Sequence, residues 1–282
     1  ALRPDLPALL ADPAVDAVYI ATPHSEHAAI ARACIEAGKP VLCEKPLAAN
    51  AAQARELIAL ARERGVFLME ALWTRYLPAL RQAEAWLLEG RIGRILALQS
   101  SFGFRCEFDP QHRNFNPALA GGTLLDIGIY NLSLSQWAMA LQGVHEAPAM
   151  QAAGVLAPTG TELRCSVQMQ YTDGTLSQFT CAFDVVLENM LRIHGEHGRI
   201  ELGPHFWGAQ RATLQPDGQP PETLALPNAC NGFEYQIEAA SRAIAAGRLE
   251  EARVPHAQTL ALLEQIDALR RQLGAVRFPF EE

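Results

Sequence analysis

The sequence contains no Gly-x-Gly-x-x-Gly segment anywhere in its 282 residues. It therefore lacks the glycine-rich loop that lets a backbone approach a dinucleotide pyrophosphate at a helix N-terminus. It also has no Cys-x-x-Cys pair, and its six cysteines are scattered, mostly in apolar segments. This distribution indicates buried thiols in a reducing compartment rather than a disulfide framework. We expect a cytoplasmic protein.

Basic clusters and long apolar runs are absent as well. The formal net charge of −8 and the lack of any Lys/Arg cluster argue against a nucleic-acid partner. The longest uncharged run, residues 127–144, is interrupted by several Ser, Asn and Gln residues, so we expect no membrane span. The first residues show no signal peptide. With 49% hydrophobic and 19% charged residues, the composition is that of an ordinary globular protein of one large or two medium domains.

The N-terminal third shows an alternating strand and helix pattern. The apolar run 15–21 predicts a buried strand, an alanine-rich helix follows over about 28–36, and residues 41–43 predict the next strand. This order is a βαβ unit, for which a right-handed crossover is expected. A further helix capped by Asn50 continues the alternation. We assign residues 1–93 to a partial Rossmann-like domain with a doubly wound parallel sheet.

The pattern changes from Arg94 onward. Residues 163–171 alternate between apolar and polar side chains, which predicts a strand with one buried face, and Thr172-Asp173-Gly174-Thr175 predicts a hairpin turn. A helix over 256–273 closes the chain. We assign residues 94–282 to an α+β domain with an open antiparallel sheet. Packing of its C-terminal helices against the first domain is left open by the sequence.

Two short motifs carry the residues of chemical interest. Glu44-Lys45-Pro46 follows the strand 41–43 directly, and ligands of open parallel sheets bind outside the carboxyl ends of the strands. Asp126 and Tyr130 stand four residues apart at the start of a helix, so they share one helical face. Each of these residues also has an ordinary structural explanation. Lys45 could be a solvated surface lysine, Asp126 could complement the helix dipole, and Tyr130 could pack in the core.

Together with the segments 70–76 (EALWTRY) and 121–130 (GGTLLDIGIY), these motifs resemble the glucose–fructose oxidoreductase/inositol dehydrogenase (Gfo/Idh/MocA) family. Within it they look most like the dihydrodiol and D-xylose dehydrogenase branch, and the resemblance covers essentially the whole chain. It implies hydride transfer between NAD or NADP and a sugar or cyclic diol, with NADP slightly favoured by the branch. The cofactor does the hard chemistry, and no metal is needed.

The family normally opens with the phosphate-binding loop that this sequence lacks. The residues at the start resemble the helix before the family's fourth strand, so we expect about 50 preceding residues, the first βαβ unit and the ribose-binding segment. Two interpretations remain: an incomplete N-terminus, or a natural short form that no longer binds the dinucleotide. Under either, this chain should hold NAD(P) poorly. The second would make it a non-catalytic ligand-binding or regulatory protein on the same fold.

The resemblance implies a division of roles among three catalytic residues. The Lys45 ammonium would orient nicotinamide and substrate and stabilise alkoxide charge. A free tyrosine has a pKa near 10. The Lys45 cation would lower that pKa and make Tyr130 a plausible general base, while Asp126 orients Lys45 or the substrate.

The resemblance also implies binding residues. Cofactor contacts are expected from Thr22, Pro23, His24, His27, Glu44, Lys45, Trp73, Arg75 and Arg113. Substrate contacts are expected from Trp73, Phe104, Arg105, Asp126, Tyr130 and Trp207. Alternatives stay open for three of them: Glu44 pairing with Lys39 or Lys45, His27 capping or packing in its helix, and Trp207 packing in the core.

Metal binding and assembly complete the expectations. His194 and His197 form a His-x-x-His pair in a predicted hairpin, but that spacing converges poorly and no third ligand lies nearby, so no metal site is expected.

The outward face of the second-domain sheet would carry mild polar residues, namely Gln168, Gln170, Ser177 or Gln178, and Thr180. Family relatives commonly pair through this sheet, so we expect a homodimer; the alternative is a solvated face on a monomer.

Overall fold

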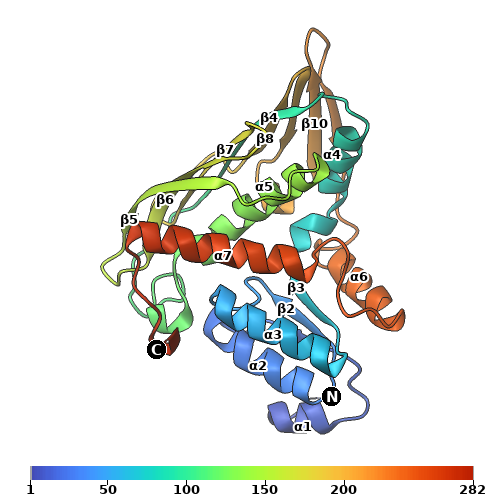
Figure 1. Ribbon diagram of the computed structural model, residues 1–282, viewed down its shortest axis with the longest axis vertical. Coiled ribbons are helices and arrows are strands. Elements are labelled where there is room, and N and C mark those ends of the chain that lie inside the picture. The colour runs from blue at the N-terminus through green and yellow to red at the C-terminus, as the bar shows by residue number, and fades with distance from the viewer. Residues whose placement is uncertain (1, 282) are drawn as a thin grey trace. The chain divides into compact units, whose positions relative to one another are not determined.

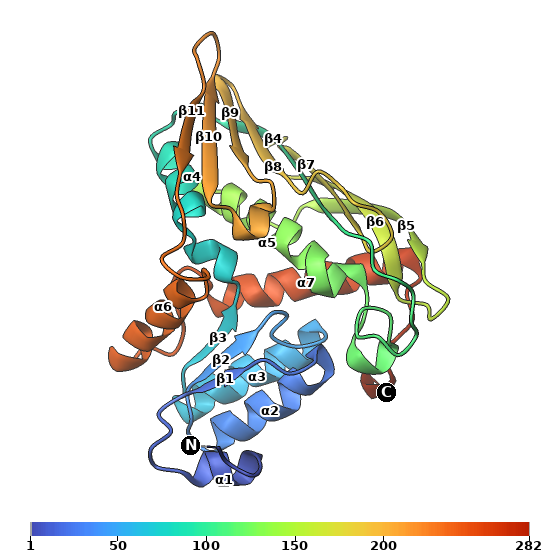
Figure 2. The same ribbon diagram turned by 180° about the vertical axis from the view of Figure 1, so that it is seen from behind.

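The computed structural model describes residues 2–281, and its contacts divide the chain into two units (Figures 1 and 2). The first unit runs to Leu72 and includes Gln236–Glu264. The second comprises Trp73–Tyr235 and the chain from Gln265 onward. Each unit has its own β-sheet.

The first unit is built on a three-stranded parallel sheet in the order β1-β2-β3. Two of its helices, α2 and α3, lie side by side and pack against each other (Figure 1). The bounds are α1 (Leu6–Ala11), β1 (Val18–Ile20), α2 (His24–Glu36), β2 (Val41–Glu44), α3 (Ala51–Arg64) and β3 (Leu68–Ala71). The βαβ order predicted from the sequence is confirmed.

Helix α3 shows how closely local sequence sets the helix bounds. The Asn50 side chain accepts a hydrogen bond from the Gln53 N–H at 2.9 Å, which satisfies one of the otherwise unpaired donors of the first turn. The helix ends at Gly65, whose φ of 65° lies in the left-handed region that glycine adopts at little cost. Both ends lie where the sequence predicts them.

The second unit is built on an eight-stranded sheet in the order β11-β10-β9-β8-β4-β7-β6-β5. The bounds are β4 (Ile95–Gly103), β5 (Ala149–Leu156), β6 (Glu162–Gln170), β7 (Leu176–Ala182), β8 (Leu191–Gly195), β9 (Gly198–Leu202), β10 (Arg211–Pro216) and β11 (Glu222–Ala225). The sheet is mixed, not purely antiparallel as predicted, because β4 pairs with β7 in parallel. A parallel pair needs a long connection, and the chain between β4 and β7 supplies it.

Two helices cover the inner face of this sheet. Helix α5 (Ile129–Leu141) contacts β4, and helix α4 (Pro78–Leu88) packs against β9 and β10 through an apolar stripe that includes Trp86 (Figure 2). The sequence-based boundary at residue 93 would place α4 in the first domain. The contacts instead group it with the second sheet, because its apolar stripe is buried there.

The remaining long helices are α6 (Glu234–Ala245) and α7 (His256–Leu273), which match the predicted helical ends of the chain. Most of α6 and the first half of α7 count with the first unit. There the His256 ring nitrogen Nε2 lies 2.8 Å from the Leu68 carbonyl oxygen, and the Leu68 N–H donates to the Leu249 carbonyl. Backbone groups of the edge strand β3 are satisfied in this way.

Candidate active site

In the first unit, the segment after β2 carries Lys45, which is partly exposed. His27, fully buried on α2, ties this segment to the loop after β1: its Nδ1 lies 2.7 Å from the Pro46 carbonyl oxygen and its Nε2 lies 2.9 Å from the Thr22 carbonyl oxygen. Burial lowers the pKa of His27, against smaller raising effects from these carbonyls and Glu44. His27 thus holds two strand-end loops through their backbones, as the packing alternative anticipated.

Glu70, at the end of β3, supports the same segment and is 1% exposed. Its Oε1 accepts a hydrogen bond from the Leu47 N–H at 2.9 Å, and its Oε2 accepts one from the Thr259 hydroxyl at 2.9 Å. Burial raises the pKa of Glu70 to about 7, with Leu47, Thr259 and the charge of Lys45 acting in the opposite direction. The sequence predicts no role for Glu70 beyond its place at the start of the segment 70–76.

Glu44, predicted to contact a cofactor ribose, accepts a hydrogen bond from the Tyr19 hydroxyl on the neighbouring strand. The alternative was pairing with Lys39 or Lys45, and the Lys39 pair is not formed. The Lys39 Nζ donates instead to the Asp12 and Val15 carbonyl oxygens at 3.0 and 2.7 Å.

The loop after β1 leads directly into the N-terminus of α2. Thr22 and Pro23 are exposed, and His24 is buried with its ring 5.8 Å from the His27 ring. No side chain caps this helix, and the buried Ser25 hydroxyl has no hydrogen-bond partner among the described residues. A hydroxyl and the positive end of a helix suit the polar, anionic parts of a dinucleotide, so these residues fit the expected cofactor.

In the second unit, Tyr130 lies in the first turn of α5 and is 7% exposed. The Trp73 indole N–H donates to the Tyr130 hydroxyl oxygen at 3.1 Å. Trp73 begins the 3₁₀ turn Trp73–Tyr76, and its ring stacks on Phe233 with centroids 4.7 Å apart. A Cβ at Gly232 would lie 2.7 Å from this ring, so the glycine leaves the space that Trp73 fills.

An aromatic cluster extends from Tyr130. Phe102 lies 6.0 Å from the Tyr130 ring centroid and stacks on Trp207 at 3.4 Å. Phe104 lies 6.2 Å from Phe102. The structure thus brings together the predicted Trp73, Phe104, Tyr130 and Trp207. Sequence reasoning missed Phe102, which looks like the end of an ordinary apolar strand, and Phe233, because nothing in the sequence links it to Trp73.

Asp126 lies on a π-helical turn, Leu124–Gly128, that leads into α5, and is 4% exposed. Its Oδ1 is 3.4 Å from Nη1 of Arg113, the residue predicted to contact the cofactor. The helix therefore opens as a π-turn, where the sequence analysis expected an ordinary helix start. Among the other predicted arginines, Arg75 is buried on its 3₁₀ turn, and Arg105 is exposed and forms a backbone bridge to Asp184.

The remaining candidates concern metals and membranes. His194 lies on β8 and His197 in the turn that follows. Within residues 2–281, no three His, Cys, Asp or Glu side chains are grouped so that they could hold a metal ion. Nor does that part of the chain contain a helix both long and apolar enough to cross a membrane.

Family models match both parts of the chain. Residues 2–72 match the oxidoreductase family with an NAD-binding Rossmann fold, and residues 80–201 match the Gfo/Idh/MocA C-terminal domain. The chain belongs to the Gfo/Idh/MocA oxidoreductase family. The family and the Rossmann-plus-sheet fold predicted from the sequence are confirmed.

Curated relatives extend the match over nearly the whole chain. The trans-1,2-dihydrobenzene-1,2-diol dehydrogenase of Mus musculus is 34% identical over 276 residues, covering 96% of this chain and 81% of the relative. The enzyme of the same name from Homo sapiens is 32% identical, with the same coverage.

Solved structures of the family agree with the architecture. The aldose–aldose oxidoreductase from Caulobacter crescentus, complexed with glycerol, superposes with a TM-score of 0.83 at 30% identity, covering 94% of this chain and 78% of that chain. The 3-ketoreductase KijD10 from Actinomadura kijaniata, in complex with NADP and TDP-benzene, superposes with a TM-score of 0.80 at 28% identity, covering 97% and 83%.

Proposed function

We propose that the native protein carrying this sequence transfers a hydride between NAD or NADP and a sugar or cyclic diol. The observation that carries the proposal is the Tyr130 hydroxyl, held by the Trp73 N–H within an aromatic cluster at the start of α5. The relatives support the substrate class, since one is a diol dehydrogenase and another an aldose oxidoreductase. NADP is slightly favoured by the dihydrodiol dehydrogenase branch that the chain resembles.

In this proposal Tyr130 takes the proton from the substrate hydroxyl while the hydrogen on the same carbon leaves as hydride. NAD(P) supplies the hydride acceptor. Tyr130 accepts this proton as the phenolate and becomes the neutral phenol. The Trp73 N–H stabilises the phenolate before the transfer, because a hydrogen bond to the charged form favours it. The Lys45 ammonium stabilises the alkoxide character of the substrate oxygen. Asp126, paired with Arg113, orients the reacting groups.

Binding is divided among the remaining predicted residues. The faces of Trp73, Phe104 and Trp207 suit the C–H face of a sugar or the ring of a diol. Thr22, Pro23 and Glu44 follow strand ends of the parallel sheet, where a dinucleotide ribose would bind. His27 contributes by holding the loops that carry them.

The test is a substrate panel of pentoses, hexoses and cyclic diols with NAD and NADP, with NAD(P)H formation followed by absorbance in the native protein. Saturable formation with at least one member is expected, together with its loss in Tyr130→Phe. A matched experiment on the 282-residue chain follows Trp fluorescence on addition of the same compounds. Binding without any NAD(P)H formation in the native protein would instead favour the non-catalytic alternative.

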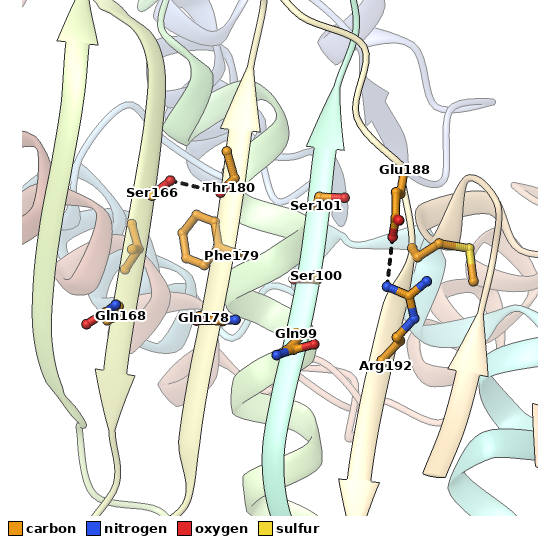
Figure 3. Close-up of a pocket in the computed structure, with 12 residues that line it drawn as sticks. Gln99, Ser100, Ser101, Ser166, Gln168, Gln178, Phe179, Thr180, Glu188 and Arg192 are labelled. Carbon is orange, nitrogen blue, oxygen red and sulfur yellow. Dashed lines mark hydrogen bonds and ion pairs between the residues drawn. The ribbon is translucent and has the colours of Figure 1, made fainter. Parts of the chain in front are cut away.

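We also propose that two copies of the chain pair through the outer face of the eight-stranded sheet. Figure 3 shows this face, where a groove of about 370 Å³ is lined by Gln99, Gln168 and Gln178 beside the Glu188–Arg192 ion pair. Amides and hydroxyls, with a charge already paired at 2.7 Å, can be buried against a second copy without an isolated charge. Gln178 points outward, whereas Ser177 is buried and hydrogen-bonds to Ser135.

A further inference from the structure

The segment 43–47 contacts Glu70 of β3 at both of its ends. Strand register places Cys43 opposite Glu70 in the β2–β3 pair, and the Leu47 N–H donates to the same glutamate. Lys45 lies midway, two residues from each contact. Glu70 therefore meets the chain on both sides of Lys45, through backbone strand pairing at Cys43 and through its carboxylate at Leu47.

The hydrogen bonds on Glu70 leave its charge uncompensated. Both recorded donors, the Leu47 N–H and the Thr259 hydroxyl, are neutral groups. A buried carboxylate is costly unless a positive charge faces it. Lys45 is the cation whose charge acts on Glu70.

The other titratable groups around Glu70 do not supply that charge. On β2, Glu44 is an acid, and burial raises the pKa of the Cys43 thiol well above its usual value, so the thiol is neutral. On α7, burial lowers the pKa of His256. On α2, burial lowers the pKa of His27, which faces Pro46. At neutral pH and above, both imidazoles are therefore mainly neutral.

We infer that Glu70 is a positioning residue for Lys45, holding the Lys45 segment through the Leu47 N–H and supplying a counter-charge to the ammonium. The catalytic part of this inference rests on the proposed function of Lys45. The counter-charge itself does not. Because the pKa of Glu70 is about 7, its proton is lost within the working pH range, and the full negative charge faces Lys45 above that point.

The pKa of Lys45 can be measured without signal overlap, because Lys39 and Lys45 are the only lysines in the 282 residues. Protein containing lysine labelled with ¹³C at Cε gives two lysine signals, each of which can be titrated by NMR. Lys39, bonded to two backbone carbonyls, serves as an internal control. Glu70→Gln removes the charge and keeps one oxygen for the Leu47 N–H, while its NH2 group replaces the oxygen that accepts from the Thr259 hydroxyl.

We expect Glu70→Gln to lower the pKa of Lys45 by about one unit, the lower end of the effect of a nearby opposite charge, and to leave Lys39 unchanged. In the unaltered protein, the Lys45 signal should also show a small second inflection near the pKa of Glu70. That inflection requires no variant, so it tests the inference even if Glu70→Gln fails to fold. Thr259→Val, which removes one neutral donor, should move the inflection to higher pH.

Glu162→Gln makes the same chemical change at a buried glutamate of the second unit, and should leave both lysine signals in place. A Lys45 pKa equal in Glu70→Gln and wild type, with no inflection near neutral pH, would overturn the inference. Because no turnover is needed, this outcome is separate from failure of the proposed function. A shifted Lys45 pKa in a protein that forms no NAD(P)H would keep the charge pairing and reject the proposed reaction.

Discussion

Among residues 2–281, Glu70 of the first unit and Glu162 of the second are almost completely buried, and the two are stabilised in different ways. In the second unit, Glu162 is paired with Arg270, whose Nε lies 2.8 Å from its Oε1. The same guanidinium lies 3.6 Å above the Phe278 ring and donates to the Val276 carbonyl at 2.8 Å. In the first unit, Glu70 accepts hydrogen bonds from neutral donors and faces Lys45, which is partly exposed.

The two carboxylates differ in the partner that faces them: an arginine bonded directly to Glu162, and neutral donors bonded to Glu70. Burial raises the pKa of Glu162, and the charge of Arg270 opposes it directly. A Cβ at Gly122 would clash with Glu162, so this ion pair also backs the turn that leads to Asp126. Glu70 instead has a pKa of about 7, beside the segment that carries Lys45. One glutamate positions its neighbour by occupying space and the other by its charge.

The largest effect should come from the residue that Glu70 supports. Lys45→Ala should lower the turnover of the native protein by ~10²–10⁴, the range for a positioned proton-transfer group, without loss of fold. Steady-state NAD(P)H formation measures the turnover, and circular dichroism measures whether the fold is retained. Lys39→Ala is the control and should stay near wild type. A Lys45→Ala enzyme as fast as wild type would remove this residue from the reaction.

Breaking the pair in the second unit should be costly in stability. Arg270→Leu leaves Glu162 buried without its cation and should lower the free energy of unfolding by about 3–5 kcal/mol, measured by urea denaturation. Adding Glu162→Gln to Arg270→Leu should recover most of the loss, since no charge then remains unpaired. If the free energy of unfolding of Arg270→Leu lies within about 1 kcal/mol of the wild-type value, the structural role of this pair is contradicted.

The pH dependence of stability sharpens the contrast. Because the pKa of Glu70 rises from 4.5 to about 7 on folding, the folded state binds more protons than the unfolded state between these values. The contribution of Glu70 to stability is therefore present at low pH and lost as pH rises, by about 3 kcal/mol over the whole window. Urea denaturation across this range should show the loss in wild type relative to Glu70→Gln. If the free energy of unfolding changes with pH in the same way in wild type and Glu70→Gln, the predicted contribution of Glu70 is contradicted.

A smaller effect is expected at the outer sheet face. Lysine at both Gln168 and Gln170 places like charges across the proposed two-fold interface, and should raise the dimer dissociation constant by at least about tenfold. Light scattering over a concentration series measures the change. Gln219→Lys, in the exposed turn between β10 and β11, is the control. A monomeric wild type, or a dimer indifferent to both lysines, would reject the proposed pairing.

The sequence predicted what depends on local patterns. The bounds of α3 follow from Asn50 and Gly65, and the alternation along β6 correctly places Cys165 inward and Gln168 outward. Lys45 and Tyr130 were proposed as catalytic residues because each belongs to a compact motif. In each case the informative residues lie within one helix, strand or turn.

What the sequence did not predict depends on contacts between distant segments. Glu162 and Arg270 are 108 residues apart, and Trp73 stacks on a phenylalanine far along the chain. The parallel β4–β7 pair likewise depends on where β4 enters the sheet, which no turn residue specifies. Glu70 looked like an ordinary motif residue, because its burial by Thr259 of α7 cannot be seen from its neighbours in sequence.

The pH–rate profile of Tyr130→Phe tests the proposed reaction most directly. In the native protein, kcat/KM for oxidation should rise with pH as Tyr130 becomes able to accept the substrate proton. Tyr130→Phe should lower the rate by ~10²–10⁴ and abolish this limb, while Trp73→Phe, which removes the N–H donor to the phenolate, should move the limb to higher pH. A Tyr130→Phe enzyme with the wild-type rate and the same limb would contradict the assignment of Tyr130 as the general base.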